Sequence, residues 1–381
     1  MSRFEDHLEK LLARGSRHRS LPALEAFDPR LLRLAGRELL NFSSNDYLAL
    51  SRLPLKERGG SQPSSRLLGG NLTAHLEVER RLAEFMDAEA ALLLPTGYMA
   101  NVGLLSALAG RGDVLLLDRA CHASLVDGAR LSGGRIERFR HNDFAALVRR
   151  LERLASDHAG AIFVVVESLY SMDGDTPDFA ALAALKKRHG FFLVVDEAHA
   201  IGLHGPQGRG LLAAQHCRGL AEAVIFTLSK AFALQGGVIA GSARLKDLLV
   251  NRCRPLIYST ALPAGRVVSV LNRIEAILAA DAARRKLEDL CRVAEHTLGL
   301  ARQVWSPIFP IVVGQGEDAR RAAAQLLEAG IYCPAVLPPT VPEGSARLRV
   351  SLNAAHENED LERLNAGLVK LGLLSDQGGP D

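Results

Sequence analysis

The sequence lacks the features that mark several specialised classes of protein. Its five cysteines are odd in number and scattered, with no Cys-x-x-Cys pair, which excludes a disulfide framework and a zinc ribbon. The 46 basic and 43 acidic residues leave a formal net charge of only +3, so neither nucleic acid nor a membrane surface is indicated as a partner. We therefore expect a soluble protein of the reducing cytoplasm.

Long apolar runs are also missing. The most apolar stretch, residues 90–110, is interrupted by Pro95, Gly97 and Gly103 and does not predict a membrane-spanning helix. The acidic residues near the N-terminus argue against a targeting peptide, and the apolar residues there are spaced as on one face of a helix.

The sequence does contain short apolar runs that alternate with helical patterns. These runs are too apolar for strands that are buried on one side only, and they predict a mostly parallel sheet with helices on both faces. The expected strands are residues 91–95, 113–118, 161–168, 191–199, 223–230 and 237–242.

A length of 381 residues predicts more than one domain. The α/β alternation ends near residue 270, where the pattern changes to a mixture of helices and separate strands. We predict an N-terminal helical segment (1–40), a large α/β domain (41–270) and a small C-terminal α+β domain (271–381).

Ligands of an open α/β sheet bind beyond the carboxyl ends of its strands, so polar residues directly after the apolar runs are candidates for a site. Asp196 ends one such run, and His199 follows three residues later. A carboxylate there can hold the pyridine nitrogen of pyridoxal 5′-phosphate (PLP) in its protonated form. The alternatives are a helix N-cap aspartate and, less favoured, a zinc site of Asp196, His199 and His204, for which no H-E-x-x-H motif is present.

Residues 196–199 also spell DEAH, which occurs in a helicase motif. A nucleotide-driven helicase requires a G-x-x-x-x-G-K-[ST] phosphate loop. The sequence contains no Gly-Lys-Ser and no Gly-Lys-Thr, so the helicase interpretation fails.

Lys230 ends another apolar run and precedes Gly236 and Gly237. A desolvated lysine has a lowered pKa and can form a Schiff base with an aldehyde cofactor. The hydroxyl of Thr227, close before it, suits a phosphate group. The alternative is a lysine at a strand end that points into water.

Two turns offer further cofactor contacts. Gly97 and Tyr98 follow an apolar run and open a helical pattern, so backbone N–H groups there can bind a phosphate, although any strand-to-helix turn can contain a glycine. Ser171 lies in a turn after the run at 161–168, where it supplies another hydroxyl or is a plain turn residue.

A histidine and a C-terminal strand complete the candidates. His122 follows the run at 113–118 and suits stacking on a cofactor ring or proton transfer, the alternative being a structural histidine. Arg347 and Arg349 share one face of a predicted strand, where they suit the carboxylate of a substrate. The alternative is an exposed strand edge with solvated charges. Thr340 lies in a proline-rich turn that can hold it toward a ligand.

The order of these motifs resembles the α-oxoamine synthases, a family of fold-type I PLP-dependent transferases. The resemblance implies a large domain with a mostly parallel sheet, a smaller α+β C-terminal domain, and homodimers whose active sites are shared between subunits. It covers nearly the whole chain through the segments NFSSNDYLALS, TGYMAN, CHASL, SMDGD, VDEAHAIGLHGPQGRG, TLSKAFALQGG, YSTALP and PPTVPEGSARLRVSLNAAH.

The resemblance also implies roles for single residues. Lys230 binds the cofactor and acts as the base, Asp196 pairs with the ring nitrogen, and His199 contacts the ring hydroxyl oxygen. His122 stacks on the ring and assists proton transfer. The cofactor is further held by Gly97, Tyr98, Ser171 and Thr227, and the implied substrate contacts are Arg19, Thr340 and Arg349.

The implied substrates are an amino acid and an acyl thioester. The segments NFSSNDYLAL and PPTVP favour a member that uses L-alanine over the glycine-using relatives. A sister enzyme that condenses glycine or serine with another acyl thioester is the alternative. Leu337 stands where alanine-using members often have an arginine, so the identity of the acyl chain is left open. A non-catalytic subunit of the same fold would be expected to lack Lys230, which argues against that alternative.

Overall fold

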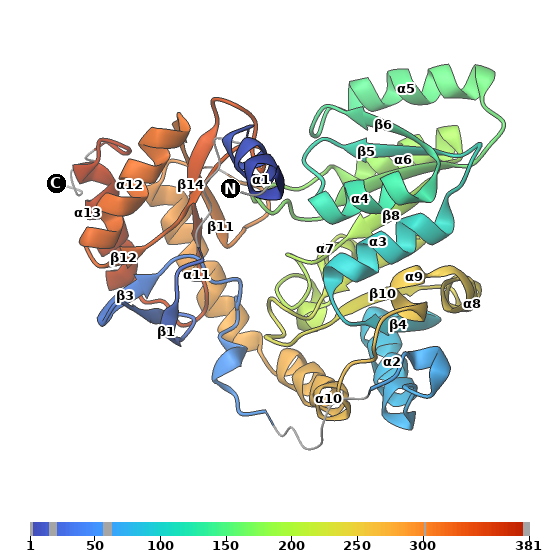
Figure 1. The fold of residues 1–381 in the computed structure, drawn as a ribbon, viewed down its shortest axis with the longest axis horizontal. Coiled ribbons are helices and arrows are strands. Elements are labelled where there is room, and N and C mark those ends of the chain that lie inside the picture. The colour runs from blue at the N-terminus through green and yellow to red at the C-terminus, as the bar shows by residue number, and fades with distance from the viewer. Residues whose placement is uncertain (1–2, 15–20, 56–62, 301, 376–381) are drawn as a thin grey trace.

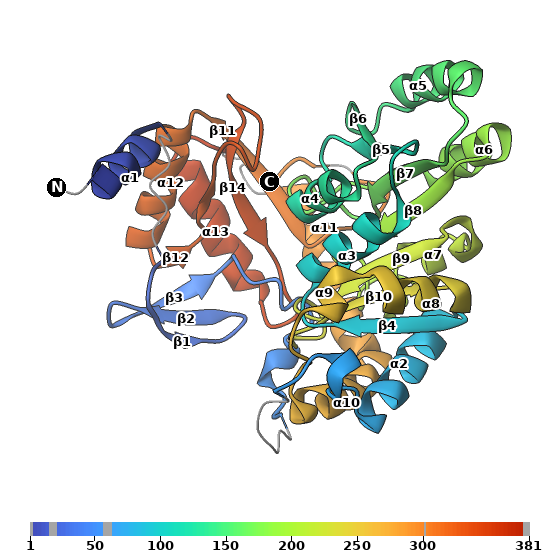
Figure 2. The same ribbon diagram turned by 45° about the vertical axis from the view of Figure 1, so that its right-hand side comes forward.

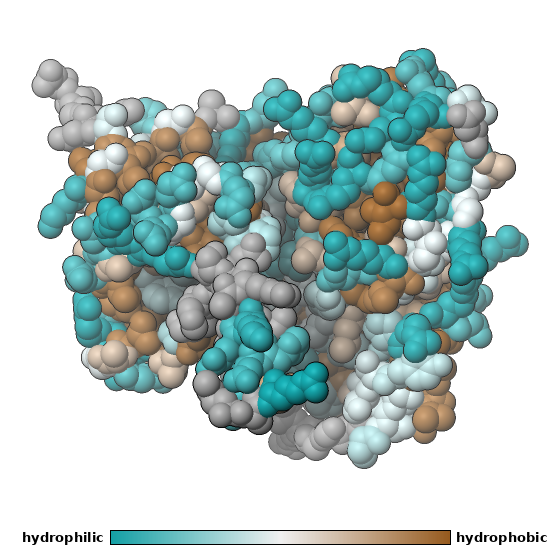
Figure 3. Space-filling model, turned by 45° about the horizontal axis from the view of Figure 1, so that its top comes forward, coloured by the Kyte–Doolittle hydropathy of each residue, from teal (hydrophilic) through white to brown (hydrophobic). Residues whose placement is uncertain are grey.

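The computed structural model describes residues 3–14, 21–55, 63–300 and 302–375. Two halves lie side by side, one built around a seven-stranded sheet and the other around two smaller sheets (Figure 1 and Figure 2). The face shown in Figure 3 is mostly hydrophilic, with apolar patches between, and is hollowed between the two halves. Among the described residues, no helix is both long and apolar enough to cross a membrane.

The large sheet is mostly parallel, as predicted. Its strands lie in the order β4-β10-β9-β8-β7-β5-β6, and β10 runs antiparallel to both of its neighbours. The strands are β4 (Ala90–Leu94), β5 (Val114–Asp118), β6 (Arg135–Phe139), β7 (Ile162–Glu167), β8 (Phe192–Asp196), β9 (Ala223–Thr227) and β10 (Gly237–Gly241).

Helices cover both faces of this sheet. Residues of β5 alternate between the faces, because Leu115 and Leu117 pack in the cluster with α3 and α4, whereas Val114 and Leu116 pack with α5 and α6. The covering helices are α3 (Gly97–Leu108), α4 (Ala123–Ser132), α5 (Phe144–Asp157), α6 (Phe179–His189), α7 (Leu211–Ala214), α8 (Ala243–Arg252) and α9 (Arg254–Ile257).

The N-terminal region differs from the helical segment expected over residues 1–40. Only α1 (Arg3–Arg14) is a helix among its described residues, and three antiparallel strands follow it. The reason is a two-residue turn at Ala35 and Gly36, both with positive φ (51° and 72°), which is typical of a hairpin. The strands are β1 (Leu24–Phe27), β2 (Leu31–Leu34) and β3 (Arg37–Asn41).

The same half contains the C-terminal region. β12 (Ile331–Tyr332) pairs in parallel with β3, so strands of the N-terminal and C-terminal regions belong to one sheet. Separately, β11, β14 and β13 form an antiparallel sheet, and the helices α12 and α13 belong to this half (Figure 1). The bounds are β11 (Ile308–Gly314), α12 (Gly316–Glu328), β13 (Ala335–Val336), β14 (Ala346–Ser351) and α13 (Asn358–Lys370).

Two long helices connect the halves. The helical pattern around residues 264–298 forms α10 (Ala264–Leu278) and α11 (Asp281–Thr297), and the predicted domain boundary at residue 270 falls inside α10. α10 packs against α2 (Thr73–Met86) beside the large sheet. A single buried cluster runs through both halves and fixes how they meet, with members that include Phe85, Phe232, Ile277, Trp305 and Phe309.

Candidate active site

A cavity of about 270 Å³ opens at the carboxyl ends of the central strands, where the sequence predicted a site. It brings together seven of the predicted residues, namely Gly97, Tyr98, His122, Asp196, His199, Thr227 and Lys230. Its remaining lining residues are Thr96, Asn101, Ser124, Glu167, Ala198, Ile225, Phe226 and Ser229.

One end of the cavity is suited to a phosphate group. The helix α3 begins there, with Thr96 as its N-cap, whose hydroxyl accepts the Met99 N–H at 3.1 Å. The hydroxyls of Thr227 and Ser229 lie 2.8 Å apart beside this helix end. Free N–H groups at a helix N-terminus together with two hydroxyls form an anion site.

Gly97 allows the close approach of α3 to Thr227. A Cβ atom added at Gly97 would lie 2.8 Å from Thr227 Cβ and 3.0 Å from its hydroxyl oxygen. Gly97→Ala is therefore expected to displace Thr227 and to weaken PLP binding by about tenfold or more, which corresponds to about 1.4 kcal/mol. The measurement is a titration of cofactor-free protein with PLP.

The matched control for Gly97→Ala is Gly110→Ala, because an added Cβ at Gly110 has no described atom within 4 Å. The control should bind PLP as the wild type does. Equal PLP affinities for Gly97→Ala and the wild type would contradict the phosphate site.

Asp196 is oriented by two donors. Its Oδ1 accepts the Ala198 N–H at 2.9 Å, and its Oδ2 accepts from Asn101 Nδ2 at 2.8 Å. Asn101 Nδ2 also donates to Ser124 Oγ at 2.9 Å, and that hydroxyl lies 2.7 Å from His122 Nδ1. One hydrogen-bond network therefore fixes both the carboxylate expected at the ring nitrogen and the histidine expected on the ring face.

Lys230 shares the cavity with two carboxyl groups. Burial lowers the pKa of Lys230 to about 8, although the Asp196 and Glu167 carboxylates act in the opposite direction. Glu167 ends β7 and accepts the backbone N–H of His122 at 2.5 Å. Burial and the nearby Asp196 raise the pKa of Glu167 to about 8. Glu167 was not predicted, because a glutamate at the end of an apolar strand carries no motif of its own.

The lowered pKa of Lys230 has a measurable consequence for cofactor capture. At pH 7.5 about a quarter of Lys230 is the reactive neutral amine, against about a thousandth of an ordinary lysine with a pKa near 10.5. The rate at which cofactor-free protein reacts with PLP should rise with pH and level off above about 8. Stopped-flow absorption measures this rate, and a midpoint near 10 would contradict the lowered pKa.

His199 is buried and neutral. Burial lowers its pKa well below the ordinary value. Its Nδ1 lies 2.6 Å from the hydroxyl of Tyr47, which is itself 3.1 Å from Asn45 Oδ1. With Nδ1 facing Tyr47, the other ring nitrogen is available to a ligand in the cavity. Tyr47 and Asn45 were not singled out from the sequence, although both lie in the segment NFSSNDYLALS.

The two predicted arginines share one face of β14, and both contact the loop at residues 171–175. Arg349 Nε donates to the Ser171 carbonyl at 2.6 Å, and its Nη2 donates to Asn45 Oδ1 at 3.2 Å. Arg347 Nη1 forms an ion pair with Asp173 Oδ1 at 2.5 Å. The guanidinium of Arg347 is thus already occupied, whereas Arg349 is held by neutral groups.

Besides these two arginines, three further predicted residues are not among those that line the cavity. Ser171 is buried in the loop that Arg349 contacts. Thr340 is exposed in the turn that follows the cis peptide bond between Pro338 and Pro339. Arg19 lies outside the described residues.

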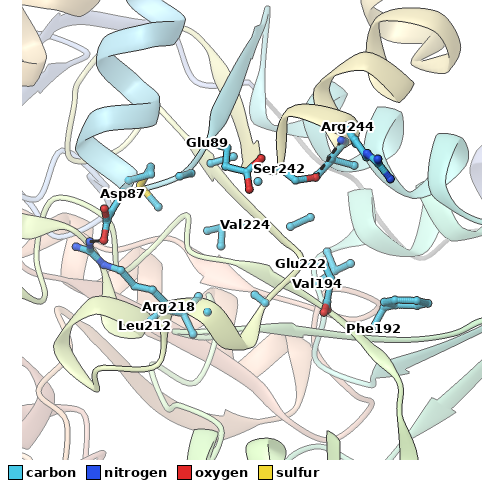
Figure 4. A pocket seen from close by; sticks show the side chains of 18 of the residues that line it. Asp87, Glu89, Phe192, Val194, Leu212, Arg218, Glu222, Val224, Ser242 and Arg244 are labelled. Atoms are coloured by element: carbon cyan, nitrogen blue, oxygen red, sulfur yellow. Dashed lines mark hydrogen bonds and ion pairs between the residues drawn. The ribbon is translucent and has the colours of Figure 1, made fainter.

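A second cavity, of about 770 Å³, lies at the opposite edge of the large sheet, where β8 and β9 begin (Figure 4). Phe192, Val194 and Val224 contribute to its lining, and Arg218 at its side pairs with Asp87 at 3.0 Å. It contains none of the predicted site residues. Within the described ranges, no group of three or more His, Cys, Asp or Glu residues is arranged to hold a metal ion.

Comparison with known proteins shows the family of the chain. The family model of class I and II aminotransferases matches residues 37–368. The chain is 40% identical over 362 residues to 8-amino-7-oxononanoate synthase of Acidithiobacillus ferrooxidans, covering 90% of each chain. It is 42% identical over 376 residues to the same enzyme of an Azoarcus species, covering 94% of each.

Solved structures agree as well. Serine palmitoyltransferase of S. paucimobilis, solved with a PLP–myriocin adduct, superposes with a TM-score of 0.88 at 30% identity and covers 97% of this chain and 98% of its own. An 8-amino-7-oxononanoate synthase of Francisella tularensis gives a TM-score of 0.72 at 25% identity, covering 88% and 99%.

The residues of the first cavity fit PLP. The N-terminus of α3 and the Thr227 hydroxyl suit its phosphate, the Asp196 carboxylate suits its ring nitrogen, and Lys230 suits its aldehyde. The chain belongs to the aminotransferase class I and II family and, within it, to the α-oxoamine synthases, and it is a PLP-dependent acyltransferase.

Proposed function

We propose that the enzyme condenses L-alanine with pimeloyl-CoA, or with the pimeloyl thioester of acyl carrier protein, to give 8-amino-7-oxononanoate, the free thiol and CO2. This reaction would place it in biotin biosynthesis. Relatives with about 40% identity over nine-tenths of the chain carry the name of this enzyme. All five cysteines are unpaired, in keeping with the reducing cytoplasm as its compartment.

The observation that carries the proposal is the position of Arg349 beside the cofactor cavity. Its Nη2 donates to Asn45 Oδ1 at 3.2 Å, and hydrogen bonds continue from Asn45 through the Tyr47 hydroxyl to His199. Burial is the main cause of the lowered pKa of His199 and Lys230, and the positive charge of Arg349 adds to it. Asn45 and the Ser171 carbonyl hold the guanidinium in place. A fixed guanidinium next to the reactive lysine is suited to the carboxylate of an α-amino acid.

Each residue then has a defined task. When bound, PLP supplies an aldehyde for the amino group of the substrate and a ring that accepts electrons from its α-carbon. Lys230 would take the α-proton and later return a proton to the product, which its pKa of about 8 allows near neutral pH. Between these steps the α-carbon attacks the thioester carbonyl, the thiol leaves, and the carboxylate is lost as CO2.

The surrounding residues bind and orient. We assign cofactor contacts to Gly97, Tyr98, Ser171 and Thr227, with Thr227 on the phosphate, and the ring nitrogen to Asp196. His199 would contact the ring hydroxyl oxygen, and His122 would stack on the ring and assist proton transfer. We assign the carboxylate of alanine to Arg349, because Arg347 is paired with Asp173. Arg19 and Thr340 stay predicted substrate contacts.

A thiol-release assay over a matrix of amino acids and acyl-CoA thioesters tests this proposal. L-Alanine with pimeloyl-CoA should give the highest kcat/KM. The second candidate is a sister enzyme that uses serine or glycine. The TM-score of 0.88 with serine palmitoyltransferase favours this second candidate. A clear preference for serine or glycine would move the assignment to that sister activity.

We also infer that the enzyme is a homodimer that shares its active sites. Several large apolar side chains are exposed on the half that contains the cofactor cavity, and such groups are suited to a subunit interface. Tyr98 lines the cavity and is 50% exposed. Light scattering after size exclusion should give the mass of two chains, and a monomer at micromolar concentration would contradict the inference. Leu67, Leu68, Leu76 and Tyr258 are further exposed apolar side chains of this half.

A further inference from the structure

His141 lies outside the cofactor cavity, yet carboxylates bind both nitrogens of its ring. Nδ1 is 2.9 Å from Asp118 Oδ1, and Nε2 is 2.9 Å from Asp175 Oδ2. Both nitrogens must donate to satisfy two acceptors, so the ring is an imidazolium. Although burial acts against it, these hydrogen bonds raise the pKa of His141 to about 10. The bridge is therefore charged throughout the neutral range.

One end of this bridge is fixed to the large sheet. Asp118 is the buried last residue of β5, and its carboxylate also accepts the backbone N–H groups of Ala120 at 2.7 Å and of Asn142 at 2.9 Å. The ring of Tyr170 meets the His141 ring edge-on, with centroids 4.4 Å apart. His141 thus has a rigid support on the side of the sheet.

The other end holds the loop at residues 171–175. Asp175 belongs to this loop and accepts from His141 and also from Asn142 Nδ2 at 2.8 Å. The loop has no regular secondary structure, so its position depends on such contacts. Without the imidazolium, the carboxylates of Asp118 and Asp175 would face each other with no charge between them.

The far side of the same loop carries the arginines of the other half. Arg349 Nε donates to the Ser171 carbonyl at 2.6 Å, and Arg302 Nη2 donates to the Asp173 carbonyl at 2.9 Å. Gly174 adopts φ 65°, and an added Cβ there would lie 2.5 Å from the Ile308 carbonyl oxygen. The loop is therefore clamped between the sheet and the C-terminal half, and Arg349 takes its position from it.

We propose that His141 is a positioning residue that holds the loop at 171–175 so that Arg349 points its guanidinium at the carboxylate of the amino-acid substrate. This inference rests on the proposed function, in which Arg349 binds that carboxylate. His141 itself touches neither the substrate nor the cofactor. Its loss should weaken binding of ligands that have a carboxylate and leave binding of a simple amine unchanged.

The test compares two ligands in holoenzyme variants. L-Alanine and ethylamine both react as amines and change the visible spectrum of the bound cofactor, but only L-alanine has a carboxylate. In His141→Ala the dissociation constant of L-alanine should rise about tenfold and that of ethylamine should stay within about twofold. His141→Gln keeps one donor and should restore part of the affinity. His296→Gln replaces an exposed histidine of α11 and should behave as wild type.

Hydrogen exchange of the cofactor-free protein gives a second readout. Exchange in residues 170–176 should be faster in His141→Ala than in wild type and unchanged in His296→Gln. Wild-type affinity for L-alanine in His141→Ala would overturn the inference, and so would an equal loss for both ligands, which indicates a general structural defect. If wild-type enzyme itself fails to bind L-alanine, the proposed function fails, and hydrogen exchange alone decides whether His141 holds the loop.

Discussion

Replacing Lys230 with alanine is expected to lower kcat at least about 10³-fold, to the detection limit of a thiol-release assay. Lys230 is the one lysine among the described lining residues of the cofactor cavity, so no other amine there could take over the proposed role of base. The carboxyl groups of Asp196 and Glu167 are poor substitutes. Asp196 is occupied by two donors, and a pKa of about 8 leaves Glu167 mostly protonated at neutral pH.

The Lys230→Ala variant should still bind PLP, though more weakly, because the phosphate site and Asp196 are untouched. A matched control is Lys187→Ala, which removes an exposed lysine of α6 and should retain full activity. Borohydride reduction of the wild-type holoenzyme followed by peptide mapping should find the cofactor on Lys230. More than a tenth of wild-type turnover in Lys230→Ala, or cofactor fixed to a different lysine, would contradict its role.

The large sheet could be predicted from the sequence because most of its strands are buried on both faces and read as unbroken apolar runs. β6 could not, since Arg135, Glu137 and Arg138 interrupt the pattern; as an edge strand it tolerates them. The N-terminal hairpin was missed for a different reason. Its turn depends on Ala35 in a left-handed conformation, which an alanine rarely adopts. An alanine at this position therefore does not predict a turn.

Some residues of the candidate site could likewise be predicted from the sequence, and others could not. Residues that follow strands, such as Lys230, Asp196 and Gly97, could be predicted because the carboxyl ends of parallel strands meet at one edge. Tyr47 could not, because its contact with His199 joins positions 152 residues apart. Only the folded chain shows that this tyrosine sits behind the histidine.

Arg347 and Arg349 show what residue spacing along a strand can predict and what it cannot. Strand alternation correctly placed Arg347 and Arg349 on one face, since residues two apart in a strand point the same way. It could not show which of them is free for a ligand. That difference comes from Asp173, which lies 174 residues before Arg347 in the sequence. Its carboxylate neutralises Arg347 and leaves Arg349 without a charged partner in this pair.

Replacing Asp196 with asparagine is expected to lower kcat by about 10²-fold or more while the fold is kept. An amide has nearly the shape of a carboxylate but no charge to hold a proton on the ring nitrogen of PLP. Lys230 would then remove the α-proton less easily, because a bound ring without the proton on its nitrogen would withdraw electrons from the α-carbon less strongly. Steady-state kinetics at saturating substrate would show the loss in kcat, with a smaller change in KM for the amino acid.

The structural cost of Asp196→Asn should be small for a geometric reason. The new oxygen can still accept the Ala198 N–H, while the new NH2 group would face the NH2 of Asn101. Asn101 Oδ1 is buried with no partner among the described residues, so a flip of the Asn101 amide offers that oxygen to the new donor. The flip gives up the hydrogen bond to Ser124, a cost of about 1 kcal/mol.

Thermal unfolding should therefore show Asp196→Asn only a few degrees below wild type. Asp178→Asn is the matched control, because Asp178 caps α6 away from the cavity and asparagine is an equally good N-cap. The control should keep both Tm and kcat. A kcat within about threefold of wild type for Asp196→Asn would mean that the ring nitrogen is not protonated through this carboxylate, and the task of Lys230 would then depend on a different source of electron withdrawal.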